Sequence, residues 1–252
     1  MKNTNTNKTE ILILAAGKGK RMQSDLPKVL MPLQGKPMLS RVLSAVHKAF
    51  REKPVAIVGH KAEMVKKEIG NLCHYALQKE QLGTGHAVSC AKKNCASSKH
   101  IMVLSGDQPF ITDKTLKKLL AKHLKSGAKI TFATALLPDF KSWRKAFAGF
   151  GRILRKKGKI EGIREYKDAG EKEKKIREVN AGCYVFEAKW LWQNLKSIKN
   201  HNAQGEYYLT DLFHIAFEEK EKVESVRINP HEALGANSKE ELEILEKLAP
   251  KR

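Results

Sequence analysis

Short apolar runs alternate with longer segments of helical hydrophobic period along the first half of the chain. The apolar runs are residues 10–14, 54–58, 73–77, 101–104 and 130–136. The segments in which apolar residues recur every three or four positions are residues 38–50, 62–69, 84–96 and 113–124. This alternation is typical of βαβ units, which place their strands in parallel and cover the sheet with helices. We therefore expect an α/β fold with a mostly parallel, mixed sheet flanked by helices.

The second half of the chain is less regular. Residues 151–154 and 160–165 are predicted to pair as a β-hairpin. Residues 179–186 are predicted to form a strand that leads into a helix over residues 190–195. Ser238 and the sequence KEELEILEKL after it combine an N-capping residue with a helical apolar stripe, which predicts a last helix.

The chain carries a large excess of positive charge. Its 252 residues include 48 Lys and Arg against 27 Asp and Glu, which gives a net charge of +21. Such a field favours anionic partners, whether phosphorylated small molecules, nucleic acids or acidic membranes, and it says nothing about the fold. Part of the excess falls in two Lys-rich stretches, residues 155–159 and 168–175, which are expected in turns or exposed loops.

Length and composition exclude several classes of protein. With 41% hydrophobic residues the chain can bury the core of one large domain, which we expect over residues 10–252 after a disordered segment 1–9. The longest strictly apolar run has six residues, far fewer than the roughly 20 that span a bilayer, and the polar N-terminus has no signal-peptide core. The four cysteines form no CxxC pair. We therefore expect a cytoplasmic protein with reduced thiols and no membrane partner.

The residues that follow the predicted strands carry the candidate chemistry. In open α/β sheets, ligands bind beyond the carboxyl ends of the strands, so residues 15–28, 78–85 and 105–109 should meet at one edge. The first of these segments contains a Gly-Lys-Gly turn, whose backbone N–H groups can approach a phosphate. Arg21 and Lys28 add two full charges that would neutralise a polyphosphate. The spacing of the glycines in this first segment matches neither the Rossmann fingerprint nor the Walker A loop.

Several sequence blocks, taken together and in order, resemble a known family. They are LAAGKGKRM and PKVL (14–30), QKEQLGTGHA (78–87), GDQP (106–109), GFGRI (149–153), EYKDA and EVNAG (165–182) and NAQGEYYLTD (202–211). The chain resembles sugar-1-phosphate nucleotidyltransferases, and in particular the N-terminal uridylyltransferase domain of the bifunctional bacterial GlmU family. The resemblance implies a Rossmann-like nucleotide-diphospho-sugar transferase fold with a smaller sugar-binding β-hairpin subregion.

The resemblance implies a role for each matching position. Those implied to bind the nucleotide are Leu14, Ala15, Ala16, Gly17, Gln78, Gly83, Thr84, Ser105, Gly106 and Asp107. Those implied to bind the sugar are Gly151, Glu165, Asn180 and Tyr208. Asp107 and Asn237 match metal ligands, and a carboxylate, an amide oxygen, phosphate oxygens and water form a suitable hard ligand set for Mg²⁺. The Gln78 amide offers both a donor and an acceptor to the edge of a uracil ring.

The implied reaction joins UTP and N-acetylglucosamine 1-phosphate to give UDP-N-acetylglucosamine, a peptidoglycan precursor, and pyrophosphate. An oxygen of the sugar phosphate would attack the α-phosphorus in line. This nucleophile is already an anion, so no general base is needed. Mg²⁺, Arg21 and Lys28 are implied to compensate the negative charge, which makes the two cationic side chains the catalytic residues.

The chain departs from the family's sequence pattern at several positions, and these departures leave alternative functions open. Ser105, Gln108 and Ala181 differ from commoner family choices, so a different sugar 1-phosphate or nucleotide stays open. A basic nucleic-acid-binding or regulatory protein on the same fold is the alternative from another class, although no motif for specific nucleic-acid recognition is visible. Hexapeptide repeats are absent from the sequence. We therefore expect no left-handed β-helix, no acetyltransferase activity, no acetyl-CoA site, and a monomer or dimer rather than the family's trimer.

Overall fold

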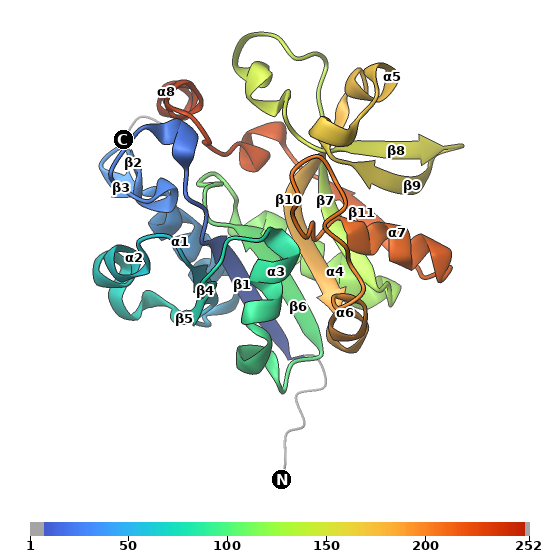
Figure 1. Cartoon of the computed structure of the whole chain (residues 1–252), viewed down its shortest axis with the longest axis horizontal. Helices are drawn as coiled ribbons and strands as arrows, with labels where there is room; N and C mark the ends of the chain where they lie inside the picture. Colours follow the sequence, from blue (N-terminus) through green and yellow to red (C-terminus); the bar gives the residue numbers. More distant parts are fainter. Residues whose placement is uncertain (1–7, 250–252) are drawn as a thin grey trace.

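A mixed sheet forms the centre of the molecule (Figure 1). The computed structural model describes residues 8–249, and these form a nine-stranded sheet whose main path runs β11-β7-β10-β6-β1-β4-β5. The strands of this path are β1 Thr9–Ala15, β4 Val55–Val58, β5 His74–Leu77, β6 His100–Ser105, β7 Ile130–Leu136, β10 Glu178–Glu187 and β11 Val223–Arg227. Strand β10 runs antiparallel to both of its neighbours on this path, and the other neighbouring pairs are parallel. The expected mostly parallel, mixed sheet is confirmed.

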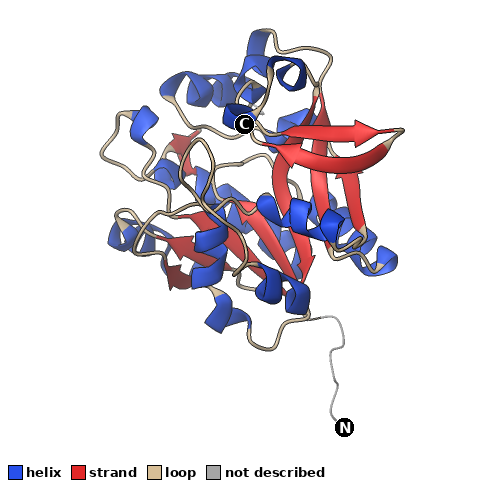
Figure 2. Cartoon of the chain, turned by 45° about the vertical axis from the view of Figure 1, so that its right-hand side comes forward, coloured by secondary structure: helices blue, strands red, loops and turns tan. Residues whose placement is uncertain are grey.

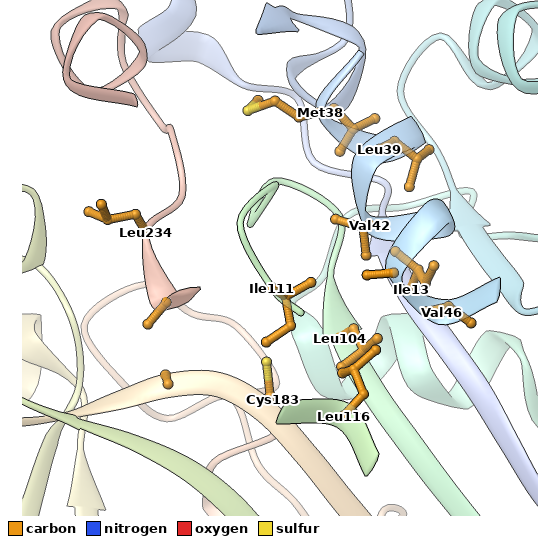
Figure 3. Packing of buried hydrophobic residues seen from close by; sticks show 14 of the residues in the cluster. Ile13, Met38, Leu39, Val42, Val46, Leu104, Ile111, Leu116, Cys183 and Leu234 are labelled. Carbon is orange, nitrogen blue, oxygen red and sulfur yellow. The ribbon is translucent and has the colours of Figure 1, made fainter. Parts of the chain in front are cut away.

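Helices cover both faces of this sheet. They are α1 Met38–Phe50, α2 Ala62–Ile69, α3 Thr84–Cys90, α4 Asp113–Ser126, α6 Ala188–Asn194 and α7 Asp211–Glu218. The last helix, α8 Lys239–Leu248, packs instead against the segments Pro32–Leu33 and Ser142–Phe147. In Figure 1, α3 and α6 lie in front of the sheet and α4 lies behind it. Successive side chains of a strand point to opposite faces, so Ile13 packs with α1 and α4 (Figure 3), whereas Leu12 packs with α3, α6 and α7. None of the helices in the described part of the chain is long and apolar enough to cross a membrane.

A β-hairpin extends the sheet beside β10. Its strands are β8 (Arg152–Lys156) and β9 (Lys159–Arg164), and Arg152 pairs with Val179 of β10. Figure 2 shows the hairpin lying across the upper end of the main sheet. Residues 155–159 are exposed around the hairpin turn. The predicted hairpin and its exposed basic turn are therefore confirmed.

Short elements connect the larger ones. A second, two-stranded sheet pairs β2 (Pro32–Leu33) with β3 (Lys36–Pro37). The 3-10 turns are η1 Lys20–Met22, η2 Lys28–Leu30, η3 Gly70–Leu72, η4 Lys92–Cys95, η5 Ser142–Phe147, η6 Tyr166–Asp168 and η7 Pro230–Ala233. The last helix begins as predicted, because the Ser238 hydroxyl accepts from the Glu241 N–H at 3.3 Å.

Several elements of the structure differ from the sequence prediction. The single helix expected over 84–96 ends at Cys90 and continues as the turn η4, because Ala91 leaves helical geometry (φ −91°, ψ 2°). The stretch 168–175 is not only loop, because α5 (Glu171–Lys174) forms within it, with the carboxylate of Glu173 accepting from the Gly170 N–H at 2.9 Å. Helix α7 and strand β11 were not predicted. β11 lies at the sheet edge and its sequence, VESVR, lacks an apolar run.

The segment 1–9, which was expected to be disordered, lies only partly within the described part of the chain. Residues 1–7 lie outside the described part of the chain. Thr9 is described and begins β1, where it pairs with His100 of β6. The prediction of disorder is therefore wrong for Thr9, because the neighbouring strand β6 extends the pairing toward the start of β1.

Candidate active site

A cavity of about 780 Å³ opens at the carboxyl ends of the parallel strands. This volume lies in the range of roughly 300–1,000 Å³ that is usual for small-molecule sites. The predicted site residues that line the cavity are Leu14, Ala15, Ala16, Gly17, Lys28, Gln78, Gly83, Thr84, Ser105, Asp107, Gly151, Glu165, Asn180 and Asn237. The structure therefore brings the segments after β1, β5 and β6 together at one edge, as expected from the topology.

Three predicted residues do not line this cavity. Arg21 lies on the turn η1 with an exposed side chain, shortly after the lining residue Lys18. Gly106 is a packing position, since its N–H donates to the Leu14 carbonyl at 2.9 Å. Tyr208 is buried, and its hydroxyl accepts from Gln204, which does line the cavity, at 2.7 Å.

Lys28 is a charged residue of the cavity lining. It begins the turn η2, which is anchored by the buried side chains of Val29 and Leu30. A Cβ at Gly19 would lie 2.8 Å from the Cβ of Lys28, so this position of the turn after β1 has to be a glycine for the two segments to approach. The Lys28 ammonium donates to Asp107 Oδ2 at 2.7 Å and to Asn237 Oδ1 at 2.9 Å.

The oxygens of Asp107 and Asn237 fit a divalent cation. They reach the cavity from β6 and from the segment before α8, and both converge on one positive charge, the Lys28 ammonium. A carboxylate and an amide oxygen are hard ligands of the kind that Mg²⁺ takes together with phosphate oxygens and water. Residues 8–249 hold no group of three or more His, Cys, Asp or Glu side chains suited to a metal. A Mg²⁺ ion at this place would therefore draw its remaining ligands from phosphate and water.

Gln78 and the start of α3 form the wall after β5. Gln78 is buried, with 3% of its surface exposed, and its side-chain NH₂ donates to the Gly83 carbonyl at 3.1 Å. Gly83 has φ +113°, and a Cβ there would lie 2.6 Å from the Tyr207 carbonyl oxygen. The Thr84 hydroxyl accepts from the Leu209 N–H at 2.9 Å. Gly83 and Thr84 therefore also hold the segment 200–209 against α3, a role that their motif did not reveal.

Glu165 and Asn180 form the opposite wall. The Thr210 hydroxyl donates to Glu165 Oε1 at 2.8 Å, and burial raises the pKa of Glu165 above its ordinary value. The Asn180 side chain donates to the Tyr184 hydroxyl at 2.6 Å, and its backbone N–H donates to the Gly151 carbonyl at 2.8 Å. These bonds position two polar side chains at the cavity surface beside the β8–β9 hairpin.

Further lining residues were not predicted. They are Lys18, Gly19, Val29, Gln81, Ala87, Gln108, Gly149, Phe150, Lys167, Gly182, Gln204, Glu206 and Gly235. Most fall inside or beside the matched sequence blocks, and that proximity could have indicated them. Gln108 has another role, since its NH₂ donates to the carbonyls of Ala181 at 2.9 Å and Ala233 at 3.1 Å. It thereby ties β10 to the segment that carries Asn237, and no local signal reveals such a bond.

Comparison with known proteins finds curated relatives along most of the chain. The chain is 48% identical over 206 residues to the bifunctional protein GlmU of Geobacillus thermodenitrificans, a match that covers 81% of this chain and 43% of that protein. It is 44% identical over 244 residues to the bifunctional protein GlmU of Shouchella clausii, covering 96% of this chain and 52% of that protein. The chain spans about half the length of these curated relatives. The resemblance to GlmU stated from the sequence is confirmed.

A solved structure supports the fold. UDP-glucose pyrophosphorylase complexed with UDP-glucose superposes with a TM-score of 0.73 at 18% sequence identity, covering 96% of this chain and 98% of that one. The expected nucleotide-diphospho-sugar transferase fold is thus confirmed. The model of the MobA-like NTP transferase domain matches residues 11–147, a range that contains the turn after β1, Lys28, Gln78 and Asp107. Because this match covers more than half of the sequence, the chain belongs to the MobA-like NTP transferase domain family.

Proposed function

We propose that the chain is a uridylyltransferase that forms UDP-N-acetylglucosamine and pyrophosphate from UTP and N-acetylglucosamine 1-phosphate. The observation that carries the proposal is the position of the Lys28 ammonium between Asp107 and Asn237, in a cavity lined on one side by Gln78 and on the other by Glu165. The bifunctional GlmU relatives support it. Because the chain matches about half of each relative, the proposal concerns this one reaction.

The order of the strands supports a particular placement of base, phosphates and sugar along the cavity. Gln78 follows β5 at one end of the main path, and Asn180 lies on β10 beyond β1 and β6. The turn after β1 and Asp107 after β6 come between them. The base would therefore lie beside Gln78, the phosphates beside Lys28, and the sugar beside Asn180.

The chemical difficulty of the reaction is electrostatic. The sugar phosphate and the nucleotide are both anions, and further charge develops on the leaving pyrophosphate. The Lys28 ammonium would stabilise this charge once phosphate oxygens replace its present acceptors, and the turn after β1 would add backbone N–H groups. Bound Mg²⁺, held by Asp107 and Asn237, would act as a Lewis acid that neutralises phosphate charge.

Proton transfer is not part of the proposed step. The attacking phosphate oxygen is already ionised, so the cavity needs no general base. Glu165 has a raised pKa, but its carboxylate is bonded to the Thr210 hydroxyl on the side assigned to the sugar. There a carboxylate can accept hydrogen bonds from sugar hydroxyls. Catalysis would then rest on positioning and on charge stabilisation.

Pyrophosphate release by the purified chain tests this proposal. UTP is combined in turn with N-acetylglucosamine 1-phosphate, glucosamine 1-phosphate and glucose 1-phosphate, each with and without Mg²⁺. CTP, dTTP and GTP are then compared with the first sugar phosphate. We expect the fastest release from UTP with N-acetylglucosamine 1-phosphate, dependent on Mg²⁺. Release from no pair would refute the proposal, and faster release from another pair would assign a different nucleotidyltransferase activity.

A further inference from the structure

The side-chain amide of Gln78 is held in one orientation. Its nitrogen lies 3.1 Å from the Gly83 carbonyl oxygen and 3.1 Å from Nδ1 of His86. A carbonyl oxygen can only accept, so the atom facing it must be the NH₂ group and cannot be the amide oxygen. Both hydrogens of that group are directed at these two acceptors. Oε1 is then the polar atom of Gln78 that remains for a ligand in the cavity it lines.

The same contacts define the tautomer of His86. Because Gln78 donates to Nδ1, the ring hydrogen must be on Nε2. Nε2 lies 3.8 Å from Sγ of Cys90, one turn further along α3, and this sulfur can serve as a weak acceptor. Burial raises the pKa of the Cys90 thiol. A chain of three side chains therefore runs along the first turns of α3 to the cavity wall.

We propose that His86 is a positioning residue for nucleobase selection. By accepting from Gln78, it acts together with the Gly83 carbonyl to hold Oε1 toward the cavity as a hydrogen-bond acceptor. Uracil carries a hydrogen on N3 and can donate to that atom, whereas cytosine presents a lone pair on N3. The inference rests on the proposed function, since it takes Gln78 as the residue that meets the base.

The alternative role of His86 is packing. The ring also lines a second cavity, on the far side of α3, with Trp192, Ile198 and Tyr207. A packing role depends on the size of the side chain, whereas the positioning role depends on an acceptor at Nδ1. Two substitutions separate these properties. His86→Phe keeps an aromatic ring and removes the acceptor, and His86→Asn loses volume but places an amide oxygen near the position of Nδ1.

The test measures nucleotide binding without turnover. Dissociation constants of UTP and CTP are determined by calorimetry for the unmodified protein and both variants. Thermal unfolding and kcat at saturating UTP are measured separately on the same three proteins. We expect the unmodified protein to prefer UTP. His86→Phe should reduce the ratio of the two affinities roughly tenfold, as for the loss of one hydrogen bond, while kcat changes little. His86→Asn should keep the ratio within about threefold of the original.

Three results would overturn the inference. The first is an unmodified protein with equal affinity for UTP and CTP. The second is a folded His86→Phe protein with an unchanged affinity ratio. The third needs no variant: nitrogen NMR of the histidine rings should show hydrogen on Nε2 of His86, and a hydrogen on Nδ1 would contradict the proposed chain of contacts.

The outcome for His86 is separable from the outcome for the reaction. If pyrophosphate is released but His86→Phe keeps the UTP preference, only the inference about His86 is wrong. If the UTP preference exists and depends on His86 but no sugar phosphate supports release, only the proposed reaction is wrong.

Discussion

The ammonium of Lys28 lies 2.7 Å from Oδ2 of Asp107, although 79 residues separate them in the chain. Both side chains are largely removed from solvent, with 19% and 13% of their surfaces exposed. Asn237 contributes a second acceptor to the same ammonium at 2.9 Å. The Lys28 ammonium thus lies beside the same two oxygens that are suited to bind a metal ion. Entry of phosphate groups would give the cation new acceptors and leave these oxygens available.

Lys28→Ala should abolish most of the activity. Removing one preorganised charge of this kind costs roughly 10²–10³-fold in rate, because water cannot replace it in a shaped site. Initial rates of pyrophosphate release measure the effect, and circular dichroism checks the fold. Lys118→Ala, on the exposed face of α4, is the control for the loss of one positive charge from the chain. Equal rates for the two variants would remove Lys28 from the proposed mechanism.

Asp107→Asn should weaken the response to Mg²⁺. The substitution keeps the size of the side chain and removes the negative charge, and the affinity of oxygen sites for such cations depends on ligand charge. We expect the half-saturating Mg²⁺ concentration to rise by roughly tenfold or more, the effect of about 1.4 kcal/mol. Titration of activity with Mg²⁺ at constant UTP measures it. Asp113→Asn, an acidic position at the start of α4, should leave the curve unchanged.

Glu165→Gln should affect the sugar substrate more than the nucleotide. The amide can still accept from Thr210, whose hydroxyl lies 2.8 Å from Glu165 Oε1, so the local structure should persist. A hydrogen bond to a charged group contributes about 1.5–3 kcal/mol, so KM for the sugar phosphate should rise roughly tenfold or more. KM for UTP should stay within about twofold of the original value. A larger change in KM for UTP than for the sugar phosphate would contradict the assignment of this wall.

Gly83→Ala should destabilise the fold. Its φ of +113° is strained for a residue with a side chain, and the new Cβ would lie 2.6 Å from the Tyr207 carbonyl oxygen. We expect the free energy of unfolding to fall by about 1–3 kcal/mol, measured by urea denaturation. Gly17→Ala is the matched control, because a Cβ there meets no atom within 4 Å. Equal stability of the two variants would show that the close approach of segment 200–209 to α3 is not needed.

His123 should make the protein sensitive to acid. Its buried ring contacts Thr131 Oγ1 at 3.0 Å and His100 Nδ1 at 3.1 Å, and burial, with His100, lowers its pKa to about 4. The folded state therefore binds this proton more weakly than the unfolded state. The stability that depends on the neutral ring is complete above pH 6.5, and it is lost as the pH falls from 6.5 to 4. The loss should reach about 3 kcal/mol.

Urea denaturation between pH 8 and pH 4 measures this loss. His123→Leu should flatten the dependence between pH 6.5 and 4.5, where most carboxylates have not yet taken up protons. His214→Gln is the control, since that side chain is exposed and pairs with Glu218 on its own helix. If His123→Leu and the unmodified protein lost stability in parallel, another group would be responsible for the acid sensitivity.

Much of the fold could be predicted because its strands are buried on both faces. Helices α1 and α2 and strand β7 have the predicted boundaries, β4 begins one residue later than predicted, and β6 is one residue longer at each end. Strand β11 was missed because its sequence, VESVR, contains no run of apolar residues. The end of α3 was missed because the apolar period continues through η4, while Ala91 leaves the helical conformation.

The candidate site was predictable as a set of residues but not as a set of contacts. The sequence by itself determined that charged and glycine-rich segments follow β1, β5 and β6, since local hydrophobic period fixes where strands end and parallel strands end at one edge. Only the tertiary structure decided that Lys28 lies between Asp107 and Asn237, which is 209 residues away. It also decided that Nδ1 of His86 lies 3.1 Å from the side-chain nitrogen of Gln78, and that Arg21 stays outside the cavity lining. Hydrogen bonds form between neighbours in space, and the order of strands in the sheet, which local sequence does not encode, sets those neighbours.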